Sequence, residues 1–360
     1  MSREDLEAPS LLGLLDLLLQ QSSVNEGFAD HIRDAKETLE SSLTESPRSP
    51  FLSVVMRTQG KRIEAFADAL LCLAAQTDSD FELVIVMHNA SEEAFEQVST
   101  EVDRHRGLLP HVTLTRAEGG TRARPLNVGV ELARGQYLAF FDDDDLLFAH
   151  WVETFHTNAR AHPGLLLRSV SGIQRITPER WPDGKDGFRT LTWSMAEYAN
   201  EFDPLRNYLA NHSPFMSIAF PSALFATLGF RFNEELAVCE DWEVIVRGAS
   251  LLGVRSVQEF TSVYRRWEDG SSSYTEHSTA EWTVAEQKLL LELDSAPTLL
   301  PAHSVSRIRT LVEDEDAAVI LHEVLASKSW TILNPVRSFA TKLRSLRARV
   351  IARIRRVRTR

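Results

Sequence analysis

The chain has 360 residues, of which 43% are hydrophobic and 25% are charged, and its formal net charge at pH 7 is −12. These values are ordinary for a soluble globular protein with one large domain or two closely joined ones. Two cysteines are too few for a disulfide framework and favour a reducing compartment. The leucine-rich stretch at 11–19 is too short to span a membrane and is interrupted by Asp16, so we expect a cytoplasmic protein.

The charge is unevenly distributed along the chain. Residues 327–360 contain eleven Lys or Arg and no acid, which leaves 28 basic against 51 acidic residues, a net charge of −23, for residues 1–326. An acidic body argues against a protein that binds nucleic acid. Apolar residues at helical spacing among the arginines of 336–360 predict a basic amphipathic helix. This helix could lie on the anionic inner face of the cytoplasmic membrane, dock on another copy of the chain, or be a solvated end.

The predicted elements follow a regular order through the first half of the chain. Residues 1–49 are expected to form a helical extension and a linker rich in Ser and Pro. Strands are predicted to begin at Phe51, Phe81, His111 and Gln136, with a helix after each of the first three. This alternation predicts an α/β fold whose mostly parallel central sheet is flanked by helices.

The second half of the chain is less regular. We expect a loop over 177–190, two short strands over 254–260 and 261–267, and helices from residue 281 to the C-terminus. The chain would then have four parts, at 1–49, 50–150, 151–280 and 281–360.

Four consecutive aspartates, Asp142–Asp145, follow the apolar run at 137–141 directly. Neighbouring carboxylates repel one another by about 1 kcal/mol even in water, and ligands gather at the carboxyl ends of strands in α/β folds. The run therefore predicts a site for a hard cation, the alternative being a solvated acidic turn. Neither a G-x-G-x-x-G after the first strand nor a Walker-type G-x-x-x-x-G-K is present, which argues against those two nucleotide sites.

Residues 50–270 resemble the nucleotide-sugar glycosyltransferases of family 2, which have the GT-A fold and invert the anomeric centre. The matching segments are SVVMRTQGKR, ARPLNVGVELARGQYLAFFDDDDLLFAHW and CEDWEVIVRGASLLGVRSVQEFTSVYRRW. Each segment is weak alone, and their order and spacing carry the resemblance. It implies that 50–150 binds the nucleotide-sugar and that 151–280 binds the acceptor and carries catalysis.

The resemblance also implies roles for individual residues. Asp142 and Asp144 would be the ends of the family's D-x-D motif and hold Mn²⁺ or Mg²⁺, which prefer oxygen ligands. Asp241 would be the general base, the alternative being that Glu240 and Asp241 only favour the positive start of a helix. The remaining candidates for binding the donor are Arg57, Thr58, Asn89, Arg122, Arg124, Asn127, Asp142, Asp143 and Arg266.

Two departures from the family pattern leave questions open. His88-Asn89 stands where the family commonly has carboxylates that contact the base, so a preference for uridine is uncertain. Trp267 stands where a histidine near the metal or phosphate is frequent; His277 could replace it or be an ordinary surface residue. Four aromatic residues are candidates either for stacking on an acceptor sugar or for the core: Trp181, Trp193, Tyr198 and Trp242.

The expected function is metal-dependent, inverting transfer of a sugar from a nucleotide diphosphate-sugar to a hydroxyl of a glycan or lipid-linked acceptor, as in polysaccharide biosynthesis. An oligomer is left open. A catalytically silent GT-A domain acting as a scaffold subunit is the main alternative. A sugar-phosphate nucleotidyltransferase is less well supported, because RTQGKR is not a Gly-rich loop.

Overall fold

The computed structural model describes residues 11–21, 25–44, 50–182, 184, 186–268, 278–295, 297–300 and 304–313. The chain divides into two compact units, Met1–Ala302 and His303–Arg360. Of the second unit the structure describes only 304–313, which is helical. The predicted amphipathic helix at 336–360 lies outside the described residues. The sheet and the candidate site belong to the first unit.

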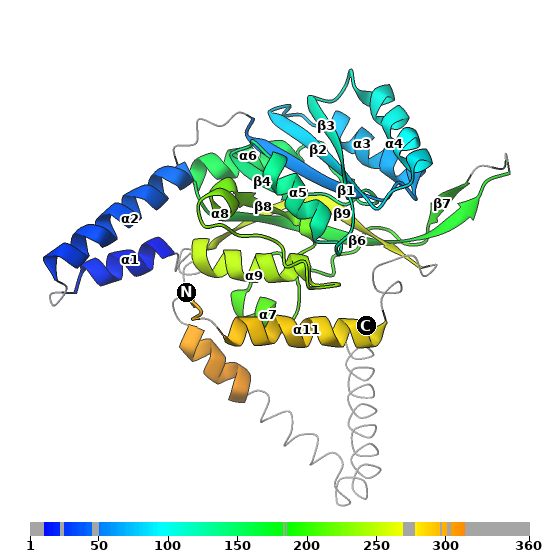
Figure 1. Ribbon diagram of the computed structural model, residues 1–360. Helices are drawn as coiled ribbons and strands as arrows, with labels where there is room; N and C mark the ends of the chain where they lie inside the picture. Colours follow the sequence, from blue (N-terminus) through cyan, green and yellow to red (C-terminus); the bar gives the residue numbers. More distant parts are fainter. Residues whose placement is uncertain are drawn as a thin grey trace, which may run out of the picture. The chain divides into compact units, whose positions relative to one another are not determined.

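Four parallel strands, in the order β3-β2-β1-β4, form one half of the central sheet (Figure 1). These strands and the helices between them are β1 (Leu52–Thr58), α3 (Ile63–Ala74), β2 (Phe81–His88), α4 (Glu92–His105), β3 (His111–Ala117), α5 (Arg124–Leu132) and β4 (Tyr137–Phe140). Strands β2 and β4 are buried along their whole length, as expected of parallel strands covered on both faces. The predicted alternation of strand and helix is confirmed.

The other half of the sheet mixes parallel and antiparallel pairs. Beyond β4 the strand order continues β8-β6-β9-β5, with β7 paired to the outer end of β6. Of these pairs only β6 with β9 is parallel. The elements of this half are β5 (Leu146–Leu147), α6 (Trp151–Ala161), β6 (Leu166–Arg180), β7 (Asp186–Thr190), α7 (Pro204–Leu209), η2 (Phe215–Ser217), β8 (Ile218–Pro221), α8 (Ser222–Ala226), α9 (Glu240–Leu252) and β9 (Val254–Trp267).

Two local predictions for this half were wrong. The segment 177–190, expected to be a loop, contains the end of β6 and the antiparallel strand β7. The two short strands expected at 254–267 form one continuous strand, β9, because β6 pairs with it from Leu166↔Val254 to Ile176↔Trp267. A β-bulge near Val170 absorbs the irregularity between the two expected strands.

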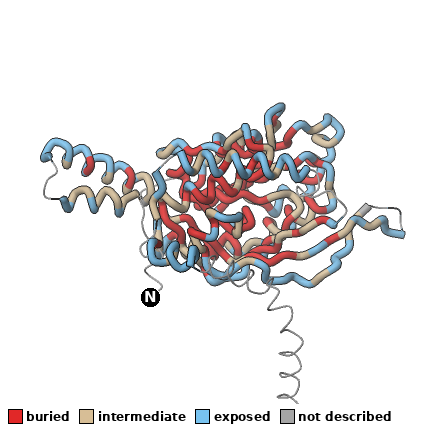
Figure 2. Tube along the Cα trace, turned by 90° about the horizontal axis from the view of Figure 1, so that it is seen from below, coloured by how far each residue is buried: buried red, intermediate tan, exposed pale blue. Residues whose placement is uncertain are grey.

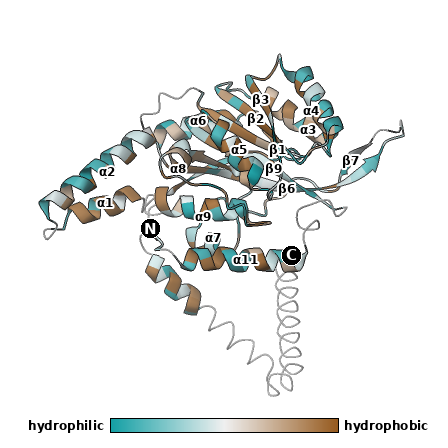
Figure 3. Ribbon diagram, viewed as in Figure 1, coloured by the Kyte–Doolittle hydropathy of each residue, from teal (hydrophilic) through white to brown (hydrophobic). Residues whose placement is uncertain are grey.

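Helices cover both faces of the sheet. Apolar residues of α3, α4 and α6 form a core with one face, and those of α5, α8 and α9 form a second core with the other. Figure 2 shows the buried residues concentrated around the sheet, and Figure 3 shows that α4 is largely hydrophilic and the strands beside it are more hydrophobic. A β-carbon on Gly129 of α5 would lie 2.3 Å from Val55 Cγ1, so the glycine lets α5 approach β1 directly.

Helices also extend the sheet domain at both of its ends, in α1 (Leu11–Leu19), α2 (Glu26–Thr44) and α11 (Thr279–Asp294). Ser278 and Glu281 form a capping box that fixes the start of α11. None of the helices in the described ranges is long and apolar enough to cross a membrane.

Candidate functional site

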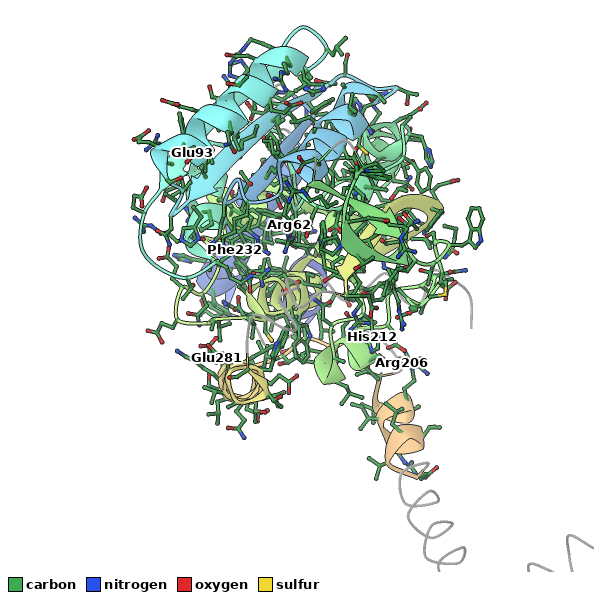
Figure 4. All side chains as sticks on the ribbon, turned by 90° about the vertical axis from the view of Figure 1, so that its right-hand side faces the viewer. Arg62, Glu93, Arg206, His212, Phe232 and Glu281 are labelled. Carbon is green, nitrogen blue, oxygen red and sulfur yellow. The ribbon has the colours of Figure 1, made fainter. Side chains whose placement is uncertain are left out.

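A cavity of about 740 Å³ opens at the carboxyl ends of β1 and β4. Its walls come from the turn after β1, the aspartate turn after β4, the segment 210–215, the first turn of α9 and the end of β9. The carboxyl ends of the parallel strands meet here, which is where ligands bind in open α/β sheets. Arg62, labelled in Figure 4, projects from the turn after β1, far from Glu93 on the outer surface of α4.

Arg57 joins the two acidic segments of the sequence. Its Nε and Nη2 donate to Oδ1 and Oδ2 of Asp142 at 2.8 and 3.2 Å, and its Nη1 donates to Oε1 of Glu240 at 2.6 Å. Arg122 also reaches Glu240, with 2.8 Å between Nε and Oε1. The side chain of Glu240 is only 2% exposed, so its charge is neutralised by two arginines inside the protein. Bidentate pairing fixes the geometry of Asp142 as well as its charge.

The charges of these groups follow from the ion pairs. Burial alone would raise the pKa of Asp142, but the neighbouring Arg57 outweighs burial and holds that pKa below its usual range. Burial would likewise raise the pKa of Glu240, and the charges of Arg122 and Arg57 lower it instead. Both carboxylates are therefore ionised at neutral pH and matched by fixed cations.

The other three aspartates of the turn have different surroundings. Burial and the charge of Asp144 raise the pKa of Asp143 to about 7, although Thr58 donates a hydrogen bond to it. Burial also raises the pKa of Asp144, which is paired with Arg62. Asp145 is buried, and its Oδ1 accepts a 2.7 Å bond from the backbone N–H of Arg265. All four aspartates line the cavity, and Asp145 also anchors the turn to β9.

Asp241 lines the same cavity from the first turn of α9. Its Oδ2 accepts a hydrogen bond from Asn211 Nδ2 at 3.1 Å, and its Oδ1 accepts one from the backbone N–H of Trp242 at 2.8 Å. Burial, helped by the charge of Glu240, raises the pKa of Asp241 to about 6. A carboxylate with this pKa is ionised at pH 7 and is a better proton acceptor than an ordinary aspartate.

The backbone just before α9 adopts an uncommon conformation. Cys239 has φ = 70°, in the left-handed region, and directly precedes the two acids of the first turn. Burial and the charges of Asp241 and Glu240 raise the pKa of its thiol to about 12, so it has no tendency to ionise. The strained residue therefore marks the turn that directs the acids into the cavity.

Trp267 takes part in the site at the position where histidine is frequent in the family. Its indole Nε1 donates to Asp144 Oδ2 at 2.8 Å. The guanidinium carbon of Arg62 lies 4.6 Å from the centroid of its ring, and Arg62 Nη1 donates to the same Oδ2. Trp267 is 7% exposed and also stacks edge-on against Phe188 of β7.

The structure brings together most of the candidate residues. Seven of them line the cavity: Arg57, Thr58, Arg122, Asp142, Asp143, Asp144 and Asp241. The other four donor-binding candidates, Asn89, Arg124, Asn127 and Arg266, are not among its lining residues. Their roles in binding the donor remain predictions.

Arg124, Asn127 and Asn89 make contacts with the protein, and Arg124 Nη1 lies 3.6 Å from Glu234 Oε1. Asn127 Nδ2 donates to the Phe232 carbonyl at 3.0 Å, and Phe232 N donates to Asn127 Oδ1 at 2.9 Å, so Asn127 ties α5 to the segment at 232–234. Asn89 has φ = 50° and accepts a 2.7 Å bond from Gly119 N. It ends β2 in a turn that an asparagine tolerates.

The aromatic candidates divide between cavity and surface. Tyr198 and Trp242 line the cavity, and Trp242 is also part of a buried core cluster. Trp181 and Trp193 are exposed. His277 lies outside the described residues.

Four functional candidates escaped the sequence prediction: Arg62, Asn211, Glu240 and Trp267. The sequence could have pointed to two of them, because Arg62 follows the first strand and Glu240 is next to Asp241. Nothing in the sequence pointed to Asn211, since it lies in an irregular segment without a motif. Trp267 was noted only as a departure from the family pattern, and its bond to Asp144 could not be read from that position.

Comparison with known proteins gives a family match for part of the chain. The family model described as Glycosyl transferase family 2 matches residues 53–228. An uncharacterized glycosyltransferase of Methanocaldococcus jannaschii is 29% identical over 97 residues, which is 27% of this chain and 33% of that protein. This chain therefore matches about a third of that relative's length.

Solved structures of S. aureus TarS are also similar. The structure of TarS 1–349 has 20% sequence identity and a TM-score of 0.43, covering 60% of each chain. The structure of the same protein in complex with UDP-GlcNAc has 18% identity and a TM-score of 0.46, covering 67% of this chain and 71% of that one.

The match to the family model spans the strands that carry the aspartate turn. The α/β fold expected from the sequence is confirmed, and the family match supports its assignment as a glycosyltransferase. Residues 53–228 are a glycosyl transferase family 2 domain.

Proposed function

We propose that the chain transfers a sugar from a nucleotide diphosphate-sugar to an acceptor hydroxyl, with inversion at the anomeric carbon. One observation carries the proposal: the aspartate turn after β4 and Asp241 of α9, from distant parts of the sequence, line one cavity. The first is suited to the leaving diphosphate and the second to the attacking hydroxyl, and inverting transfer needs both groups on opposite sides of one sugar.

The aspartate turn fits a divalent cation that is shared with the donor. Within the described ranges no three His, Cys, Asp or Glu side chains are grouped so as to hold an ion by themselves. Magnesium is commonly held by one or two carboxylates together with substrate phosphates, and this turn presents Asp142 and Asp144 to the cavity. Asp144 is the better direct ligand, because both oxygens of Asp142 are engaged by Arg57.

A cation bound there would offset the negative charge that develops on the diphosphate as the glycosidic bond breaks. The positive charges of Arg57 and Arg122 would also help to offset the negative charge on the diphosphate. Each is held by Glu240, so neither has to reorganise during the reaction.

Asp241 is the base in this proposal. The acceptor hydroxyl loses its proton to the carboxylate while its oxygen attacks the anomeric carbon, and the bond from that carbon to the diphosphate breaks in the same displacement. Asn211 and the Trp242 N–H hold the carboxylate in one orientation. With a pKa of about 6, Asp241 is mostly ionised at pH 7.

The acceptor is proposed to be a glycan or a lipid-linked saccharide. The basic stretch at 336–360 would bring the domain to an anionic membrane surface that carries such an acceptor. Co-sedimentation with liposomes containing anionic lipid, comparing the full chain with one ending at residue 335, tests this part. Equal binding of the two chains contradicts it.

A thermal-shift screen of nucleotide-sugars, with and without Mn²⁺, tests the donor half of the proposal. A donor that binds the native state raises the melting temperature by mass action. We expect one donor to stabilise the chain only with metal present, and Asp144→Asn to abolish that response. The matched control is Asp103→Asn, which removes a surface carboxylate of α4 that is paired with Arg106. This variant should respond to the donor like the wild type.

A further inference from the structure

One ion pair in the cavity has no role in the proposed function so far. Arg62 Nη1 donates to Asp144 Oδ2, and Asp144 is the carboxylate that suits a cation best. The guanidinium therefore occupies the same ligand as the cation would. A positive charge from the protein and one from the solvent cannot both sit at this oxygen without repulsion.

The geometry leaves room for exchange at Asp144. Both donors to this carboxylate, Arg62 Nη1 and Trp267 Nε1, end on Oδ2. In the described part of the chain no hydrogen bond ends on Oδ1. Since the side chain of Asp144 is 16% exposed and lines the cavity, Oδ1 is available on the open side, while the indole N–H continues to fix the orientation of the carboxylate.

Arg62 is placed to move, in contrast to Arg57. Arg57 is 11% exposed, and its donors end on Asp142, Glu240 and the Arg122 carbonyl, which fixes it from three directions. Arg62 stands at the N-cap of α3, is 25% exposed, and rests on the face of Trp267. An aromatic face attracts a guanidinium without fixing its rotation, so the contact with Trp267 does not tie Arg62 to Asp144.

We propose that Arg62 is an exchangeable counter-ion that couples cation binding to diphosphate binding. Before the donor arrives, it neutralises Asp144. When the donor binds together with its cation, Asp144 ligates the cation and Arg62 turns to the diphosphate, whose oxygens suit a guanidinium as a bidentate partner. The proposal rests on the proposed function, because a cation at Asp144 is what releases Arg62.

This arrangement has a specific thermodynamic consequence. A cation that binds alone at Asp144 repels the guanidinium of Arg62, so this ion pair has to break and the affinity for the cation is reduced. A cation that arrives with a diphosphate gives the released guanidinium a new anionic partner. Removing the guanidinium should therefore strengthen the binding of the cation alone and weaken the binding of the cation together with a diphosphate. Loss of a merely structural contact would not change the two affinities in opposite directions.

The test measures Mn²⁺ binding to the full chain by the electron paramagnetic resonance signal of free Mn²⁺, and manganese pyrophosphate binding by calorimetry. The chains compared are the wild type, Arg62→Gln and Arg189→Gln, the last removing a surface guanidinium from Glu179. If Asp144 is paired with Arg62 about nine-tenths of the time, only about a tenth of the chains are ready to bind Mn²⁺ alone. Arg62→Gln should then lower the dissociation constant for Mn²⁺ alone by about tenfold. The dissociation constant for manganese pyrophosphate should rise several-fold, and Arg189→Gln should change neither.

The outcomes separate this proposal from the proposed function. The counter-ion role is overturned if Arg62→Gln binds Mn²⁺ alone with an affinity within about twofold of wild type. It is also overturned if Arg62→Gln binds manganese pyrophosphate as tightly as the wild type does. Either result leaves the metal site standing if Asp144→Asn still abolishes binding. If Asp144→Asn binds both probes like the wild type, the metal site itself is wrong and both proposals fall. Should Arg62→Gln fold poorly by circular dichroism, Arg62→Met repeats the comparison with an apolar stem over Trp267.

Discussion

Arg57 Nη1 lies 2.6 Å from Glu240 Oε1, although the two residues are 183 positions apart in the sequence. The same guanidinium holds Asp142 with its other nitrogens, so a single side chain joins the end of β1, the aspartate turn and the start of α9. One ion-pair network therefore holds the aspartate turn and the first turn of α9 in place relative to each other.

Replacing Arg57 should destabilise the fold as well as the site. Arg57→Gln leaves Asp142 and the buried Glu240 without their shared cation, and breaking a buried pair in this way costs about 3 kcal/mol. We expect a drop of that size in the free energy of unfolding, measured by urea denaturation. Arg189→Gln, which breaks an exposed pair, should stay within about 0.5 kcal/mol of wild type. A loss for Arg57→Gln no larger than that of Arg189→Gln would contradict the network.

The activity should depend on pH through Asp241. The base acts in its ionised form, and burial with the charge of Glu240 raises its pKa to about 6. The value of kcat/KM should thus rise with pH up to about 6 and level off above it, falling about tenfold per unit below that pKa. A pH–rate profile on the metal-loaded chain checks this. A profile that is flat between pH 5 and 7 would be evidence against Asp241 as the base.

Asn211 should act through Asp241 without touching the donor. Asn211→Ala removes the amide that donates to Asp241 Oδ2 and stabilises its ionised form. We expect kcat to fall about tenfold, the KM for the donor to stay unchanged, and the pH profile to shift to higher pH. The control is Asn158→Ala, because the Asn158 amide donates to the Thr154 carbonyl within α6. An unshifted profile would mean that Asn211 does not support the base.

Asp143 should make the metal-free fold less stable as pH rises. Its folded-state pKa of about 7, raised by burial and the charge of Asp144, exceeds an unfolded value of about 3.9. The folded state therefore binds the proton more tightly, so this contribution to stability is complete below pH 4 and is lost as pH rises through 7. In EDTA at pH 8, Asp143→Asn should be more stable than wild type by about 1–2 kcal/mol. Urea denaturation at pH 5 and pH 8 measures the effect, and equal differences at both values would contradict it.

Trp267 should contribute to stability through its N–H as well as its ring. Trp267→Phe keeps an aromatic face for Arg62 but removes the 2.8 Å bond to Asp144. A hydrogen bond to a charged group is worth about 1.5–3 kcal/mol, so we expect a loss near the lower value. Trp193→Phe is the matched control, because Trp193 is 91% exposed. Equal stabilities of the two variants would show that the bond to Asp144 does not hold the turn.

The parts of the fold and site that could be predicted are those fixed by local pattern. Buried apolar runs gave β1, β2 and β4. The carboxyl ends of parallel strands meet at one edge of the sheet. Arg57, near the end of β1, and Asp142, just after β4, were therefore expected to lie close together. The family resemblance added Asp241, whose place depends on α9 and not on any strand end.

The parts that could not be predicted depend on contacts between distant side chains. The family resemblance made Asn127 a candidate for binding the donor, but the sequence did not reveal that its amide also holds the segment at 232–234. The pairing of Arg62 with Asp144 requires the turn after β1 to face β9. The continuity of β9 depends on its long pairing with β6, which hydrophobic periodicity does not reveal.

The most direct test of the account compares turnover and donor binding in Asp241→Asn. With Mn²⁺ and the donor found by thermal shift, wild type should transfer the sugar with inversion, seen by nuclear magnetic resonance of the anomeric proton, and EDTA should stop the reaction. Asp241→Asn should lose about a hundredfold or more of kcat, the usual contribution of a general base, while it binds the donor like the wild type. Full turnover in Asp241→Asn, or a product with retained configuration, would contradict the proposed mechanism.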